Sequence, residues 1–375
     1  MATPQCERPM RERVEEYINK LQDEIVSAFE KLDPSSPPFK RDSWVRPQGG
    51  SGRSCVFAST ASSDLAALNG EPSPNASGQQ SILEKAGVNI SVVHGNLPPA
   101  AIKQMRADHS SMPLPEREEG LPFFAAGLSL VVHPRNPHAP TVHANYRYFE
   151  ITEPKASSST EASQGEAENA QPKVLAWWFG GGSDLTPSYL YEEDAVHWHT
   201  TIRDACTPHG PQLYPTFKKW CDEYFYIPHR GETRGIGGVF FDDLNSGPHA
   251  RFPGAAEGEE PKRPRTPNEC FAFAQSLGNA FVPSYLPILS KRHSLNYSPA
   301  ERRWQLLRRG RYVEFNLVYD RGTKFGLMTP GARIESILMS LPETARWEYM
   351  SEVGQEEGSE EEKVMTVLKE PREWV

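Results

Sequence analysis

The chain has 375 residues, of which 37% are hydrophobic and 24% charged, and its formal net charge is -9. This length and composition are typical of one large globular domain or two ordinary ones, with enough apolar residues for a sizeable core. The acidic balance argues against nonspecific binding to nucleic acid or to an anionic membrane, because both repel a negatively charged protein. No apolar run approaches the length that spans a bilayer, so the sequence predicts a soluble protein without an integral membrane segment.

The cysteines and the N-terminal segment indicate the cellular compartment in which the protein is found. Five cysteines are scattered along the chain without a C-x-x-C pair, which favours a reducing compartment over a disulfide framework or a zinc site. The N-terminal segment mixes Glu with Lys and Arg, whereas a mitochondrial presequence is poor in acidic residues and a secretory signal carries an apolar stretch. We therefore expect a cytoplasmic protein, although a mitochondrial protein whose presequence had been removed would look the same.

Hydrophobic periodicity predicts the elements in chain order. Apolar residues at helical spacing indicate a surface helix over about residues 8–32. Alternating or continuous apolar runs predict strands at 123–134, 141–151, 173–181, 235–243 and 311–320. Helices are expected at about 187–205, 211–224, 267–291 and 299–309, with a short helix after Arg333. The first two strands form a hairpin and the helices come in uneven blocks, so we expect an α/β fold of the α+β type: a large, mainly antiparallel sheet sandwiched by α-helices.

Three segments look like insertions into this fold. Residues 59–80, 153–172 and 246–266 are rich in Ser, Gly, Pro, Ala or Glu and show no buried face. Such composition is typical of mobile surface loops. The segments do not divide the chain into halves of different composition, so residues 1–375 are predicted to form a single domain.

Polar side chains converge on two neighbouring predicted strands. Alternation places His143, Asn145 and Arg147 on one face of the strand 141–151, and it places Ser129 and His133 together on the preceding strand. A solvated sheet face is the alternative interpretation of a single polar strand. Two adjacent strands with no Lys or Glu on that face favour a pocket, in which an Arg side chain binds a carboxylate through two nitrogens.

The sequence GGGSDLTP at residues 180–187 follows a predicted strand. A phosphate-binding loop would need Lys with Ser or Thr after the glycines, whereas Asp184 would repel a phosphate. We interpret the segment as a turn in which the glycines let the backbone approach a bulky, flat ligand. Thr186 would then cap the following helix, with Pro187 at its first position.

Four histidines could meet in space although they lie far apart in the sequence. These are His133, His143, His199 and His229. None has the close spacing of a motif such as H-E-x-x-H. A non-haem metal site built from all four is one hypothesis, and hydrogen-bonded structural or acid–base histidines are the alternative.

Several long segments resemble, in the same order, the signatures of the oxygen-dependent coproporphyrinogen-III oxidase family. They are SLVVHPRNPHAPTVHANYRYFE, WWFGGGSDLTP, EEDAVHWH, HRGETRGIGGVFFDDL, EFNLVYDRGTKFGL and GARIESILMSLP, and they extend from about residue 120 to 350. The resemblance implies a homodimer that converts two propionates of coproporphyrinogen III to vinyls, giving protoporphyrinogen IX in haem biosynthesis. It implies O2 as oxidant, CO2 and H2O2 as products and no organic cofactor, and it leaves the use of a metal open. The alternatives are a non-haem metal oxygenase that uses the four histidines, and a tetrapyrrole-binding protein without turnover.

The resemblance also assigns roles, position by position. His143 would be the proton donor, and Asp320 with Arg321 would hold or deprotonate the pyrrole N–H groups. Substrate binding would fall to Ser129, Asn145, Arg147, Gly331, Ala332 and Arg333, with Asp184 and Arg234 as further pocket members. Many family members have Gly where this chain has Ala332, and a backbone N–H contact would survive Ala unless the position needs a positive φ.

Overall fold

The computed structural model describes residues 8–47, 49–58, 80–108, 120–154, 172–252, 261–328 and 332–375. Most of the predicted insertions at 59–80 and 153–172, the middle of the one at 246–266, and Gly331 lie outside the described residues. His249 and Arg263, at the described ends of the third insertion, are buried, so the expectation that this segment has no buried face is wrong for its ends. No helix of the described ranges is long and apolar enough to cross a membrane.

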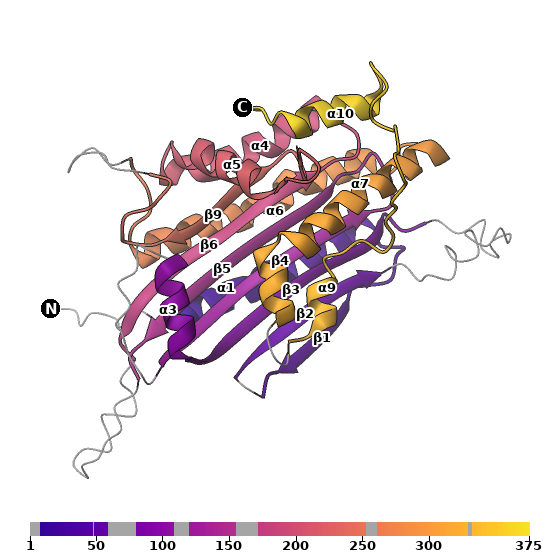
Figure 1. Cartoon of the computed structure of the whole chain (residues 1–375). Coiled ribbons are helices and arrows are strands. Elements are labelled where there is room, and N and C mark those ends of the chain that lie inside the picture. Colours follow the sequence, from indigo (N-terminus) through magenta and orange to yellow (C-terminus); the bar gives the residue numbers. More distant parts are fainter. Residues whose placement is uncertain are drawn as a thin grey trace, which may run out of the picture.

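A seven-stranded sheet organises the chain, in the order β1-β2-β3-β4-β5-β6-β9 (Figure 1). Its strands are β1 Lys40–Val45, β2 Gly50–Ala58, β3 Leu83–Leu97, β4 Leu121–Pro134, β5 Thr141–Thr152, β6 Val174–Thr186 and β9 Gly238–Leu244. Every neighbouring pair is antiparallel. The antiparallel sheet predicted from the sequence is therefore confirmed.

Helices lie on both faces of this sheet. They are α1 Met10–Leu32, α3 Pro99–Asp108, α4 Glu192–Cys206, α5 Leu213–Tyr224, α6 Pro267–Arg292, α7 Pro299–Val318, α8 Arg321–Met328, α9 Ile334–Leu338 and α10 Glu360–Lys369. A one-turn 3₁₀ helix, Thr207–His209, follows α4, and β7 Tyr226–Ile227 pairs with β8 Glu232–Thr233 in a small second sheet. The sandwich of helices around the sheet is also as predicted.

One face of the sheet packs on α1 and α6 and forms the main core. The even-numbered residues of β4 from Phe124 to Val132 are buried there, together with the apolar stripe of α1 that includes Ile18 and Ile25. The hydroxyl of Tyr146 on β5 donates to the carbonyl of Leu277 on α6 at 3.1 Å. Because side chains alternate along a strand, the odd-numbered residues of β4 and β5 point to the opposite face.

The opposite face is covered by α7, α8 and α9, as Figure 1 shows, and this arrangement corrects one prediction. Residues 311–320 were expected to form a strand, but α7 continues through them to Val318. Buried Tyr312, Phe315 and Asn316 follow a helical spacing, whereas Leu317 and Val318 are exposed. Aromatic and β-branched residues favour strands only weakly, and tertiary packing of a helix overrides that preference.

The segment 180–187 is also different from its prediction. It contains no turn after residue 181, because β6 continues to Thr186 and pairs on both sides, for example Gly182 with Asn145 and with Phe240. The next helix, α4, begins at Glu192, so Thr186 does not cap it. Hydrogen bonds from two neighbouring strands keep the glycines extended, and a single sequence does not reveal those neighbours.

Buried ion pairs attach α7 to both sheets. Glu84 on β3 is 2% exposed and accepts hydrogen bonds from Arg302, at 2.6 Å, and from Arg309. Burial by itself raises the pKa of Glu84, but the charges of Arg309 and Arg302 outweigh it and lower the pKa to about 2. Arg308 forms a second buried pair with Glu232 on β8, at 2.7 Å.

Glu84→Ala should lower the free energy of unfolding by about 3–5 kcal/mol, because it leaves Arg309 buried without its counter-charge. Urea unfolding at pH 7 measures this. Glu24→Ala, which removes an exposed pair with Lys20, is the matched control and should cost less than about 1 kcal/mol. The pKa of folded Glu84 is depressed, so its contribution is present above the unfolded pKa and is lost as the pH falls toward 2. Equal losses in the two variants would contradict the prediction.

Candidate active site

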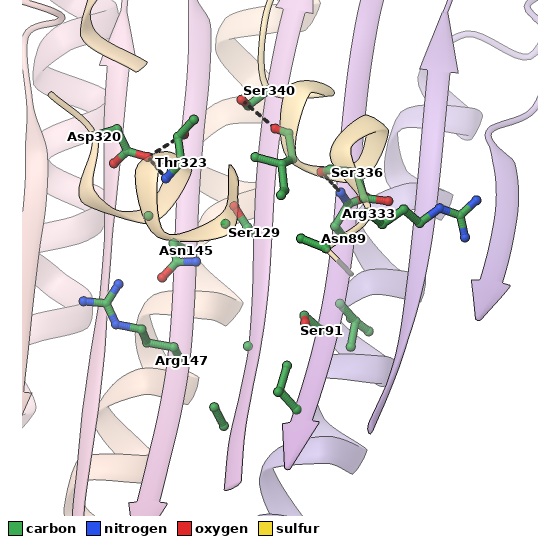
Figure 2. Close-up of a pocket in the computed structure, with 18 of the residues that line it drawn as sticks. Asn89, Ser91, Ser129, Asn145, Arg147, Asp320, Thr323, Arg333, Ser336 and Ser340 are labelled. Carbon is green, nitrogen blue, oxygen red and sulfur yellow. Dashed lines mark hydrogen bonds between the residues drawn. The ribbon is translucent and has the colours of Figure 1, made fainter. Parts of the chain in front are cut away.

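A large cleft lies on the face of the seven-stranded sheet opposite α1 and α6. It lies between this face and the segments around α8 and α9. Its volume is about 1160 Å³, and residues from β1, from β3 to β6, from β9 and from residues 316–340 line it. Figure 2 shows Ser129, Asn145 and Arg147 pointing into it from β4 and β5, with Asn89 and Ser91 on β3 beside them. A cleft of this size is large enough for a bulky organic ligand.

The floor of the cleft consists of rows of side chains that run across the sheet. In one row Asn89 pairs with Ser129 and Ser129 with Asn145; in the next, Ser91 pairs with Gly127 and Gly127 with Arg147. The polar faces of β4 and β5 therefore coincide, as the alternation predicted. Beyond Arg147 the row continues to Gly180, where a Cβ atom would lie 2.7 Å from the Arg147 Nε. Small residues thus keep the floor flat and leave space for the guanidinium.

A carboxylate stands over one end of this floor. Asp320 follows the end of α7, and its Oδ2 accepts from the backbone N–H and the hydroxyl of Thr323, both at 2.7 Å. Its Oδ1 accepts from the hydroxyl of Tyr224 at 2.9 Å. Burial by itself would raise the pKa of Asp320, but the hydrogen bonds from Thr323 and from the Tyr224 hydroxyl lower it below its usual value. Asp320 is therefore ionised at neutral pH.

His143 lies on β5 at the same end of the cleft. Burial and the nearby charge of Arg234 lower its pKa to about 3, so the imidazole is neutral at pH 7. Its ring packs edge-on against Phe225, and its Nδ1 is buried with no hydrogen-bond partner among the described residues. A neutral imidazole with one free nitrogen can accept a proton or pass one on.

Arg234 and Asp184 form a buried pair behind this end. The Arg234 Nε donates to the Asp184 Oδ2 at 3.0 Å, and its Nη1 donates to the Asn316 Oδ1 at 2.9 Å. The guanidinium lies 4.0 Å from the ring centre of Phe225, and its Nη2 has no partner among the described residues. Asp184 is 0% exposed and does not line the cleft, so its part is to hold Arg234. The prediction that places Asp184 at a turn in the ligand wall is wrong, although Gly181 and Gly182 do line the cleft.

The remaining predicted binding residues are distributed around the cleft. Arg147 donates to Asp242 at 2.6 Å, and Arg333 pairs with Asp42. Ala332 lines the cleft and has no positive φ, so a Gly-to-Ala change there leaves the backbone unstrained. Arg321 is exposed, with its guanidinium 5.2 Å from the centre of the Tyr224 ring, and it is not part of the lining.

The four histidines do not come together. His133 contacts Thr141 and the Ser340 carbonyl, and His199 contacts Tyr214 and the Ile236 carbonyl. His229 lies between Tyr319 and Glu314, at 2.7 Å from each. Of the four, only His143 lines the cleft. Within the described ranges no group of three or more His, Cys, Asp or Glu side chains is placed to hold a metal ion.

Several lining residues were not identified from the sequence. Asn89 and Ser91 alternate with buried Val88, Ile90 and Val92 on β3, so the strand periodicity could have found them. Trp44 and Arg46 belong to the short hairpin β1–β2, whose sequence has no strong strand signal. Tyr224 reaches the cleft only because α5 ends beside Asp320, and no pattern in the sequence shows that.

Known proteins match this chain over nearly its whole length. Residues 13–374 match the family model of coproporphyrinogen III oxidase. The chain is 49% identical over 368 residues to the oxygen-dependent coproporphyrinogen-III oxidase of Drosophila melanogaster, covering 98% of this chain and 78% of that protein. It is 48% identical over 366 residues to the mitochondrial enzyme of that name from Homo sapiens, covering 98% and 67%. A chloroplastic enzyme of that name from Glycine max is 45% identical over 371 residues, covering 99% and 81%. These similarities include every element that lines the cleft.

The imidazole of His143 should stay neutral from pH 8 down to about pH 4, because its pKa is lowered to about 3 whereas an unperturbed histidine titrates near pH 6.5. Histidine ring resonances followed by NMR during a pH titration test this, with the His143→Gln spectrum as the assignment control. A titration midpoint above pH 6 for the His143 resonance would contradict it.

Proposed function

The chain belongs to the coproporphyrinogen III oxidase family, and on that basis we propose that it oxidatively decarboxylates two propionates of coproporphyrinogen III. The product is protoporphyrinogen IX, which places the protein in haem biosynthesis. One observation supports this function most directly: an ionised Asp320, a neutral His143 and the donors of Arg147 and Arg234 occupy one end of a flat-floored cleft. A flat macrocycle with four carboxylates needs a floor without bulky side chains, cations for the carboxylates and an acceptor for the pyrrole N–H groups.

The chemistry balances with O2 as the oxidant. Each propionate, –CH2CH2COOH, loses CO2, two protons and two electrons and becomes a vinyl group, –CH=CH2. One O2 accepts the two protons and the two electrons and leaves as H2O2. The electrons come from the electron-rich porphyrinogen, so the protein has to bind, orient and move protons.

Asp320 is proposed as the group that accepts the pyrrole N–H. Its lowered pKa keeps it ionised, and the hydrogen bonds from Thr323 and Tyr224 hold both oxygens in place. A carboxylate held this way stabilises positive charge that develops on the pyrrole ring as the electrons leave. The three hydrogen bonds fix its orientation before substrate enters, so no reorganisation is needed during the reaction.

His143 is proposed as the proton donor. In the empty cleft it is neutral, because burial and Arg234 oppose its charged form. Carboxylates of a bound substrate add negative charge beside it and raise its pKa. The bound substrate thereby brings the imidazole toward the protonation state that proton donation requires.

The residues proposed to bind the substrate are of two kinds: arginines for its propionates, and other lining residues for its macrocycle. Arg147 and Arg234, each already paired with one carboxylate, are proposed to bind propionates of the substrate through their remaining N–H groups. Ser129, Asn145 and the segment at Ala332 and Arg333 line the same cleft and are proposed to contact the macrocycle. Arg321 lies outside the lining, so its proposed part is to pack on Tyr224, which holds Asp320.

A homodimer is proposed on the strength of exposed apolar side chains beside α7. Val318 and Trp347 are 47% and 54% exposed, and Tyr349 and Met350, just beyond Glu348, are more exposed still. Trp347 is bound to α7 through Glu314, at 2.9 Å. Exposed apolar groups gathered in this way are typical of interaction surfaces. Sedimentation of the wild type against Trp347→Asp tests the proposal, which fails if both are monomeric.

The cytoplasm remains the proposed compartment, and the several acidic residues of α1, which packs on the sheet as part of the core, support it. The relatives from Homo sapiens and Glycine max are named mitochondrial and chloroplastic, so an organelle is the alternative. Cell fractionation with organelle markers separates the two, and recovery in an organelle fraction would overturn the proposal.

Turnover should not require a metal, because the donor set that a metal would need is dispersed among other contacts. Enzyme treated with a chelator and checked by elemental analysis should release CO2 from coproporphyrinogen III in air and none without oxygen. Activity that is lost with the metal and returns with it would support a metal oxygenase instead. Binding of the porphyrinogen without CO2 release under any condition would indicate a carrier protein.

Asp320→Asn should lower kcat by about 10²-fold or more with little change in KM, because Asn keeps the shape of the side chain but cannot accept a proton or balance a positive charge. Steady-state kinetics and a thermal melt measure the two effects separately. Asp204→Asn, which changes an exposed carboxylate on α4, is the control and should match the wild type. Near-normal kcat in Asp320→Asn would assign the proton acceptor to another group.

A further inference from the structure

The cleft has a second end that the proposed chemistry does not use. Asp320 and His143 lie over β5 and β6, whereas the β1–β2 hairpin forms the opposite end with Trp44, Arg46 and Arg333. Four strand spacings separate β1 from β5, which is roughly 19 Å across the sheet. A ligand that reaches both ends contacts the protein at two places. Only one of them carries the proposed catalytic residues Asp320 and His143.

Arg46 is presented to this end by a tight turn. Its backbone N–H donates to the Gly50 carbonyl at 2.9 Å, and its carbonyl accepts from the Gly49 N–H at 3.0 Å. Gly49 and Gly50 have φ values of 111° and 107°, which residues with a side chain rarely adopt. A Cβ on Gly50 would lie 2.1 Å from the Val92 carbonyl oxygen, so the turn sits directly on β3. The backbone of Arg46 is therefore held in place before any ligand binds.

The guanidinium of Arg46 has an unused donor in the cleft wall. Its Nε is buried and has no hydrogen-bond partner among the described residues. The neighbouring Arg333 is already paired with Asp42 and lies over Trp44, with 4.7 Å between its guanidinium carbon and the ring centre. A buried cationic donor without a partner is costly, and that cost falls when an anion binds.

We propose that Arg46 binds the carboxylate of a propionate that does not react, at the end of the cleft opposite Asp320. This inference rests on the proposed function, because only two of the four propionates of coproporphyrinogen III become vinyls. The distance from Asp320 and His143 excludes a reacting propionate at Arg46. Two carboxylates line the cleft, Asp320 at the opposite end and the exposed Glu335 on α9.

This contact acts on binding more than on chemistry. The carboxylate at Arg46 is the same in the substrate, in the product of the first decarboxylation and in the final product. An interaction that is equal in the ground state and the transition state changes KM and leaves kcat unaltered. Arg46 is therefore a binding residue that determines which end of the macrocycle faces Asp320.

The test uses Arg46→Gln with two porphyrinogens. The first is coproporphyrinogen III, for which KM should rise roughly tenfold with kcat unchanged, because a hydrogen bond to a charged group is removed. The second carries ethyl groups in place of the two non-reacting propionates, and its affinity is measured as a competitive inhibition constant. In the wild type this analogue should bind roughly tenfold more weakly than the parent, and Arg46→Gln should not weaken it further.

Three controls make the result decisive. Arg41→Gln changes an arginine on β1 that contacts Glu30 outside the cleft, and it should match the wild type. Arg46→Lys keeps the charge and should recover part of the affinity, and thermal melts identify any variant that fails to fold. Equal weakening of both porphyrinogens by Arg46→Gln, or a fall in kcat with KM unchanged, would overturn the role of Arg46. A wild type that does not decarboxylate coproporphyrinogen III would instead overturn the proposed function.

Discussion

A buried charge is stable in a protein only when an opposite charge or several hydrogen bonds accompany it, and this constraint locates α7 in the fold. Arg309 is paired with Glu84, Arg308 with Glu232, and Asn316 accepts from Arg234, which is itself paired with Asp184. These contacts connect α7 to β3, to β8 and, through Arg234, to β6. Asp320 lies two residues beyond the end of the helix, so its position over the cleft depends on the same pairs.

At neutral pH the cleft holds an ionised carboxylate and a neutral imidazole close together. Burial makes His143 neutral, whereas hydrogen bonds from Thr323 and Tyr224 keep Asp320 ionised although it is close by. The pKa of each group is lowered, and titratable groups with perturbed pKa values that lie together are typical of functional sites. The floor beneath them has little bulk, because Gly127, Gly182 and Ser91 leave the strands nearly bare. Asp320 and His143 therefore lie beside the flat floor of the cleft.

Asp320 and Arg46 lie at opposite ends of the cleft. Asp320 and His143 come from α7 and β5, and Arg46 comes from a glycine turn near the N-terminal edge of the sheet. The sheet is a rigid connection between them, because each strand pairs along its length with the next. A substrate bound at both ends keeps its orientation relative to Asp320 by virtue of that rigidity.

The sequence by itself determined the antiparallel hairpin β4–β5 and the face that carries Ser129, His143, Asn145 and Arg147, because side-chain alternation is a local property of a strand. Its long motifs also determined the family. The tertiary structure alone decided that residues 311–318 are helical, that Asp184 supports Arg234 from outside the cleft, and that three of the four histidines have other partners. Each of these depends on contacts between residues far apart in the chain, such as Arg309 with Glu84, and such contacts leave no periodic pattern in one sequence.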